Sequence, residues 1–180
     1  MRRHPNCTRL ALWLACFFWC GAAAYAGVGT SSFTAQATVN TDCTILTTPV
    51  AFGGYDPIGA HRSANLNATG SITVACIKGT APTIALDLGS NASGSARQMR
   101  DVPSGDFLGY ELYQPPSNAP GTPCSFPGTA VWGTAGANLF TATSAPTKAA
   151  RTYNVCGSVP AGQNPSIGTY SDTVVATVSF

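Results

Sequence analysis

Four cysteines are the residues of this sequence whose chemistry is easiest to predict. They are Cys43, Cys76, Cys124 and Cys156, and three more lie within the first 20 residues. Cysteines bind zinc as thiolates, or pair with one another in oxidising compartments. The sequence has no Cys-x-x-Cys spacing, and His61 is the only histidine after His4. We therefore expect disulfides, and neither a metal ion nor a cofactor.

The pairing of these cysteines is not determined by their order, because four cysteines allow three connectivities. We favour Cys43–Cys76 and Cys124–Cys156, which close two loops of similar length. In the chain-entropy model each bridge would stabilise the fold by roughly 3–4 kcal/mol.

Catalytic groups are sparse. An enzyme needs a nucleophile with a base, paired carboxylates or a metal cluster. A serine triad would depend on His61 alone, no Gly-x-Ser-x-Gly occurs, and the seven acidic residues are scattered singly. We therefore predict no enzyme. The ordinary structural roles are a solvated loop for His61, turn caps for Asp56 and Asp172, and a core anchor for Trp132.

The composition indicates an all-β protein. Only 9% of the 180 residues are charged and 44% are hydrophobic, with 19 glycines and 13 prolines. Disordered tails carry more charge, and helical bundles need more Glu, Lys, Arg and Met. Apolar and polar residues alternate in several short runs, which predicts strands with one apolar face. These runs are 33–41, 71–76, 83–88, 107–113, 130–133, 151–155 and 170–180.

The N-terminus predicts a secretory signal peptide over residues 1–26. Three arginines precede an apolar run over 10–19, and Ala24-Tyr25-Ala26 offers a cleavage site. Cys16 inside that run leaves a lipoprotein signal as an alternative. The remaining 154 residues hold six basic and seven acidic side chains, so they lack the basic footprint of a nucleic-acid-binding protein.

About seven strands in one compact stretch suggest a sandwich of two sheets. The unusual feature is that regular alternating strands lie at both ends of the mature chain. Domains seldom begin and end with such strands unless both are paired. If the last strand has no further neighbour, the sheet edge beside it is open.

Several motifs, in this order and spacing, resemble the spore coat U domain family of archaic chaperone–usher pilins. They are Cys43-Thr44-Ile45, residues 50–57, the strand of Cys76, Arg100, residues 107–113, residues 131–133, residues 159–163 and residues 168–174. The resemblance implies an incomplete immunoglobulin-like sandwich that lacks its last strand, over residues 41–180. It also implies a donor-strand extension over 27–40.

In this family a periplasmic chaperone lends a strand to the open groove, and an outer-membrane usher exchanges it for the N-terminal strand of another subunit. The resemblance thus implies a fimbrial subunit, exported through the periplasm to the cell surface, that supports adhesion or biofilm formation. A free carboxylate at Phe180 would be held by basic groups of the chaperone. The donor residues would be Phe33, Ala35, Ala37 and Val39, with Phe33 in the main pocket. The acceptor residues would be Val174, Ala176, Val178 and Phe180.

Other interpretations remain open at this point. Residues 33–41 could instead pair within their own domain as an ordinary first strand. The chain could be a tip adhesin or surface-binding module, although adhesins of this class typically have two domains. It could also be a structural component of a spore coat.

Overall fold

The computed structural model describes residues 27–180, so the predicted signal peptide and its cleavage site lie outside the described residues. The chain divides after Thr38, and Val39–Phe180 form one compact unit. Residues 27–42 contain no helix or strand, and Phe33 is 93% exposed. The strand expected over 33–41 is therefore absent from the isolated chain. An extended segment without a neighbouring strand has no partner for the N–H and C=O groups that would form the ladder.

The compact unit is built from eight short strands and two single turns of 3-10 helix, η1 (Ala60–Arg62) and η2 (Gly136–Asn138). None of the helical turns in residues 27–180 has the length and hydrophobicity that a bilayer crossing requires. The strands are β1 (Cys43–Thr48), β2 (Leu66–Cys76), β3 (Thr83–Leu86), β4 (Arg97–Arg100), β5 (Phe107–Tyr113), β6 (Phe140–Thr141), β7 (Arg151–Val159) and β8 (Ala176–Ser179).

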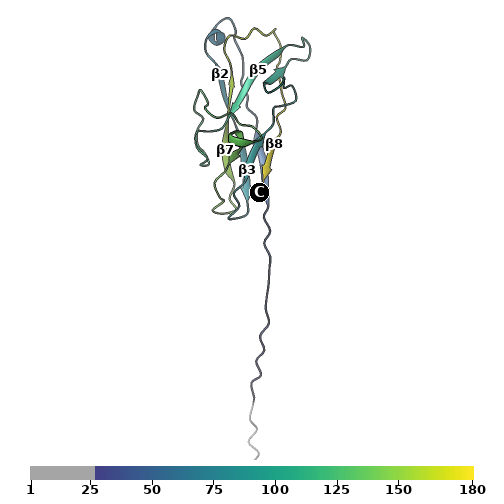
Figure 1. Ribbon diagram of the computed structural model, residues 1–180, viewed down its shortest axis with the longest axis vertical. Helices are drawn as coiled ribbons and strands as arrows, with labels where there is room; N and C mark the ends of the chain where they lie inside the picture. The colour runs from purple at the N-terminus through teal and green to yellow at the C-terminus, as the bar shows by residue number, and fades with distance from the viewer. Residues whose placement is uncertain (1–26) are drawn as a thin grey trace, which may run out of the picture. The chain divides into compact units, whose positions relative to one another are not determined.

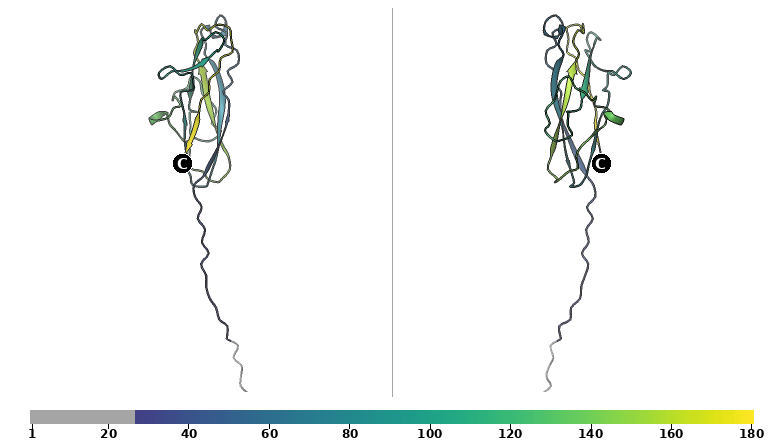
Figure 2. Two further views of the ribbon diagram at one scale, coloured as in Figure 1. Left: turned by 90° about the vertical axis from the view of Figure 1, so that its right-hand side faces the viewer. Right: turned by 60° about the vertical axis from the view of Figure 1, so that its left-hand side comes forward.

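The strands form two antiparallel sheets. One has the order β1-β2-β7-β5-β4, and the other has the order β6-β3-β8. Figure 1 shows β3 beside β8, and the two views of Figure 2 show the sheets as two layers. This is the predicted all-β sandwich, and it is immunoglobulin-like.

Alternating side chains from both sheets fill the core, as the two-residue period predicted. In β2, Ile72 and Val74 are buried, and in β5 Leu108, Tyr110 and Leu112 are buried. Trp132 is fully buried, and its indole N–H donates to the carbonyl of Ile84 at 2.9 Å. Its expected role as a core anchor is confirmed. Apolar burial of this kind contributes about 1.5–3 kcal/mol for each large side chain.

Two strands differ from their predicted lengths. Residues 130–133 were expected to form a strand, but they make only an isolated bridge between Val131 and Tyr113. The chain turns away because the N–H of Gly133 donates to the carbonyl of Asn138. The expected strand over 170–180 is confined to β8, since residues 172–175 leave the ladder.

Both disulfides have the expected pairing. Cys43–Cys76 joins β1 to β2, and Cys124–Cys156 holds the proline-rich loop after β5 to β7. Since Cys43 and Cys76 also face each other in the β1–β2 ladder, the first bridge fixes the point where the chain enters the sandwich.

Candidate functional site

The two sheets end in four edge strands among the described residues, β1 and β4 in one sheet and β6 and β8 in the other, and the site lies beside β1 and β8. β1 pairs only with β2, and β8 pairs only with β3. An irregular segment, residues 49–57, follows β1, and a second one, residues 165–175, precedes β8. An unpaired edge presents a row of free N–H and C=O groups, which is a template for another strand.

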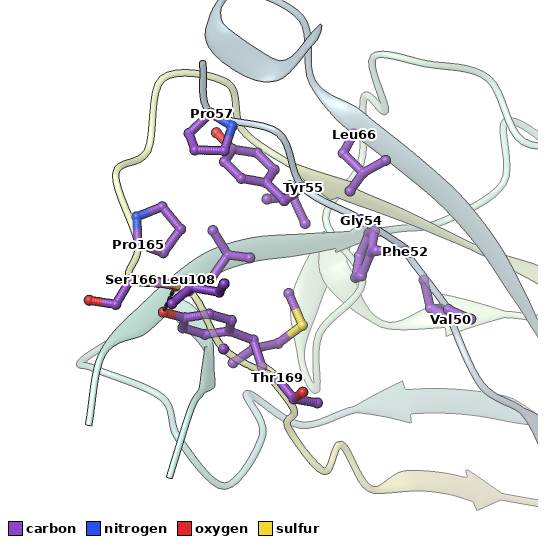
Figure 3. Close-up of a pocket in the computed structure, with 17 residues that line it drawn as sticks. Val50, Phe52, Gly54, Tyr55, Pro57, Leu66, Leu108, Pro165, Ser166 and Thr169 are labelled. Atoms are coloured by element: carbon purple, nitrogen blue, oxygen red, sulfur yellow. Dashed lines mark hydrogen bonds between the residues drawn. The ribbon is translucent and has the colours of Figure 1, made fainter. Parts of the chain in front are cut away.

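A groove lies between these two segments. It consists of two adjoining cavities of about 630 and 400 Å³, both lined by parts of the two segments. The inner faces of β2, β5 and β7 form its floor, and Leu108 and Val159 of the larger cavity are core residues. Figure 3 shows the larger cavity, with Val50 and Phe52 on one side and Pro165 and Ser166 on the other.

Two glycines of the floor allow Val50 and Phe52 to pack closely. A Cβ on Gly157 would lie 2.5 Å from Val50 and 2.8 Å from the ring of Phe52. A Cβ on Gly70 would lie 2.7 Å from Val50. Both contacts are far shorter than van der Waals separation, so only glycine fits at these positions. The segment 49–52 is thereby seated inside the sandwich, where Phe52 meets Tyr110 edge to face at 6.0 Å.

The opposite wall, residues 165–175, is held by carboxylates as well as by backbone bonds, which include an isolated bridge between Ser171 and Arg100. The N–H of Ser166 donates to Asp106 at 3.0 Å, and the N–H of Thr169 donates to Asp101 at 3.0 Å. Hydrogen bonds from Ser104 and then Thr169 lower the pKa of Asp101, and hydrogen bonds from Ser166 lower that of Asp106. These bonds favour the charged carboxylates.

The lower part of this wall is fixed in the same manner. The N–H of Val175 donates to Asp87 at 2.9 Å. Asp172 accepts bonds from the Tyr110 hydroxyl at 2.6 Å and from Asn91. Burial, followed by the bond to Asp172, raises the pKa of Tyr110 well above its usual range. Asp172 therefore joins distant segments and is not the local turn cap that we expected.

Two of the four predicted acceptor residues, Val174 and Ala176, line the groove, and Val178 and Phe180 do not. Val174, Ala176 and Val178 are half-buried and pack against the core, and Val174 and Ala176 line the smaller cavity. Phe180 is 55% exposed and lies outside both cavity linings. The predicted donor residues are all exposed, with Val39 at 76%.

Sequence reasoning missed the other side of the groove. Residues 50–57 were recognised only as a family motif, yet Val50 and Phe52 line both cavities. Ile45 was also missed. It lies opposite inward-facing Val74 and is 40% exposed. The alternation of Val50 with Phe52 was the available signal.

His61 has a structural role. Its Nδ1 accepts the N–H of Asp56 at 2.8 Å, and its ring stacks on Tyr55 at 5.0 Å. Asp56 caps its turn as expected, by accepting the N–H groups of Ile58 and Gly59, and these bonds lower its pKa. Within residues 27–180, no three His, Cys, Asp or Glu side chains are grouped so that they could hold a metal ion.

The fold and groove define a class of protein, an immunoglobulin-like sandwich without its final strand. Comparison with known proteins gives the family. Residues 29–177 match the model of the Spore Coat Protein U domain, and the chain belongs to this family. It is 35% identical over 139 residues to Protein U of Myxococcus xanthus, a match that covers 72% of this chain and 70% of that protein.

A similar solved structure is the chaperone–tip adhesion subunit pre-assembly complex CsuC–CsuE, from archaic chaperone–usher Csu pili of Acinetobacter baumannii. The TM-score is 0.55 at 25% identity, over 79% of this chain. Our chain spans only 41% of the matched chain, so the comparison concerns one part of that protein.

Proposed function

We propose that this protein is a structural subunit of an archaic chaperone–usher pilus that polymerises by donor-strand exchange. The observation that carries the proposal is the groove between the unpaired edges of β1 and β8, whose floor consists of core residues. An added strand would pair with these edges through its backbone and place alternate side chains in the cavities.

The donor that we propose is residues 27–40 of another copy or of a related pilin. Phe33, Ala35, Ala37 and Val39 alternate with polar residues, so they share one face of an extended strand. All four are exposed in the isolated chain, so they are free to contact another subunit. Phe33, the largest of the four, would enter the main pocket. Because donor and acceptor surfaces differ, the assembly is an open filament and not a closed ring.

The remaining partners follow from this mechanism. A periplasmic chaperone would cover the groove before assembly, which the chaperone–subunit complex found among the structural neighbours supports. An outer-membrane usher would catalyse the exchange, after export through the periplasm directed by residues 1–26. The finished fimbrium would lie at the cell surface, in adhesion or biofilm formation. The role is structural, without catalysis.

The deciding experiment uses a chain that begins at Thr41 and a synthetic peptide of residues 27–40. The thermal unfolding midpoint is measured with and without the peptide. A peptide that binds only the folded state raises the midpoint, by about 2.7 kcal/mol of stability at a concentration of 100 Kd. A shuffled peptide of the same composition is the control.

The opposite outcome would be a chain already stable alone, with no shift and no peptide binding. The sandwich would then be self-sufficient, and donor-strand exchange would be wrong. A coat component, the alternative suggested by the likeness to Protein U, or a tip module would then take precedence.

A further inference from the structure

The two cavities of the groove share a boundary. Four residues line both of them, Val50, Phe52, Met99 and Tyr170. Since a side chain that borders two adjoining cavities lies between them, these four form a ridge across the groove. The groove is therefore deep, then shallow, then deep along its length.

The ridge side chains have no space in which to move towards the floor of the groove. Val50 and Phe52 already fill the depression left by Gly70 and Gly157, at distances that leave no space even for a methyl group on the floor. Phe52 is also supported from the side by Tyr110. Tyr110 is in turn fixed by its hydrogen bond to Asp172. The height of the ridge is thus set by packing on two sides.

The proposed donor face has a matching profile. In order it reads Phe33, Ala35, Ala37 and Val39, which is large, small, small, large. In an extended strand the outer two side chains are about 20 Å apart, at about 3.3 Å per residue. The groove walls, residues 47–57 and 165–176, are longer than this seven-residue stretch.

We infer that the ridge sets the register of the donor strand of a second copy. Ala35 and Ala37 cross over Val50 and Phe52, Phe33 occupies the 630 Å³ cavity, and Val39 occupies the 400 Å³ cavity. A slip by two residues in either direction would place Phe33 or Val39 on the ridge. This inference rests on the proposed function, and it assigns to Phe52 a role in determining which donor sequences fit.

The test compares four peptides of residues 27–40 on the full chain. The chain is unfolded in denaturant with its disulfides intact, then refolded with increasing peptide. Native mass spectrometry gives the peptide concentration at which half of the chain is in one-to-one complex. The peptides are the natural sequence, A37F, V39F and T38F, the last placing the same bulk on the opposite face.

We expect A37F to require about tenfold more peptide than the natural sequence, because overpacking a filled site is unfavourable. V39F and T38F should stay within about threefold of it. The substitution F52A in the acceptor chain lowers the ridge, so it should restore binding of the A37F peptide. If F52A does not fold, the four peptides on the natural chain still decide the result.

Two other outcomes distinguish a failure of the register inference from a failure of the proposed function. If the natural peptide binds and A37F binds equally well, the ridge does not set the register, while donor-strand exchange stands. If the natural peptide fails to bind at all, the proposed function is wrong, and the inference falls with it.

Discussion

Arg97 connects the two sheets at the scale of a single residue. It is 1% exposed, forms an ion pair with Glu111, and donates to the carbonyls of Asp87 at 2.6 Å and Trp132 at 2.7 Å. Its guanidinium fork suits several acceptors at once. A buried pair of this kind is most costly when one partner is removed, because the other charge is left uncompensated.

Replacing Arg97 should therefore destabilise the domain strongly. For Arg97→Ala we expect a loss of about 3–5 kcal/mol in the free energy of unfolding, measured by denaturant titration. Arg62→Ala, which removes an exposed arginine from η1, is the control and should change the value by less than about 0.5 kcal/mol. Equal effects of both substitutions would contradict the bridging role.

Phe33 is the residue on which donor affinity should depend most. Phe33→Asp would place a charge without a partner against the apolar side chains that line part of the 630 Å³ cavity. We expect the affinity of the 27–40 peptide to fall by at least about 2 kcal/mol, close to a factor of 30. Thr34→Asp, on the opposite face, is the matched control. Titration calorimetry measures both, and a Phe33→Asp peptide that binds like the natural one would remove Phe33 from the interface.

The two groove walls differ at the scale of elements, because one packs on glycines and the other is held partly by carboxylates. Gly157→Ala should displace Val50 and Phe52 into the groove. We expect a loss of about 1–3 kcal/mol in stability and weaker binding of the donor peptide. Gly54→Ala is the control for stability alone, since a Cβ there meets nothing within 4 Å but would face the larger cavity. If Gly157→Ala leaves both quantities unchanged, the close packing at the floor has no energetic role.

The carboxylates that hold the wall at residues 165–175 predict that the stability of the domain depends on pH. The pKa values of Asp101 and Asp106 are lowered from 3.8, so their folded forms bind protons less readily than their unfolded forms. Their contribution to stability is present above 3.8 and is lost as the pH falls toward the folded values. The thermal midpoint should fall below about pH 4, and less steeply in Asp101→Asn. If the thermal midpoints of the natural protein and of Asp101→Asn fall equally with pH, Asp101 does not contribute to the pH dependence.

The sequence predicted those elements whose burial follows a local period. β2, β3 and β5 alternate cleanly because one face meets the core and the other meets water. β1 was not predicted as a strand, because both its faces are largely exposed and its residues show no apolar alternation. The packing of Phe52 was also unpredictable, because it depends on Gly157, which lies 105 positions away in the chain.

At the scale of the whole molecule, the proposed mechanism places a donor at one end of the sequence and an acceptor groove between β1 and β8, so assembly would depend on both. Deleting residues 27–39 should leave the compact unit folded and able to bind a chaperone, since the acceptor groove is intact. Filament formation should be lost. Electron microscopy of cells expressing the truncated chain measures assembly, and co-purification with the chaperone is the control. Filaments built by the truncated chain would mean that another segment acts as donor.

The exposed segment before β1 has one further consequence, which concerns proteolysis. Extended and exposed chain is the preferred substrate of proteases. Yet from residue 27 to His61 the sequence contains neither lysine nor arginine. Trypsin-like enzymes therefore find no cleavage site in the most accessible part of the chain. A subunit awaiting assembly, or one at a free filament end, would keep this segment intact in surroundings rich in such enzymes.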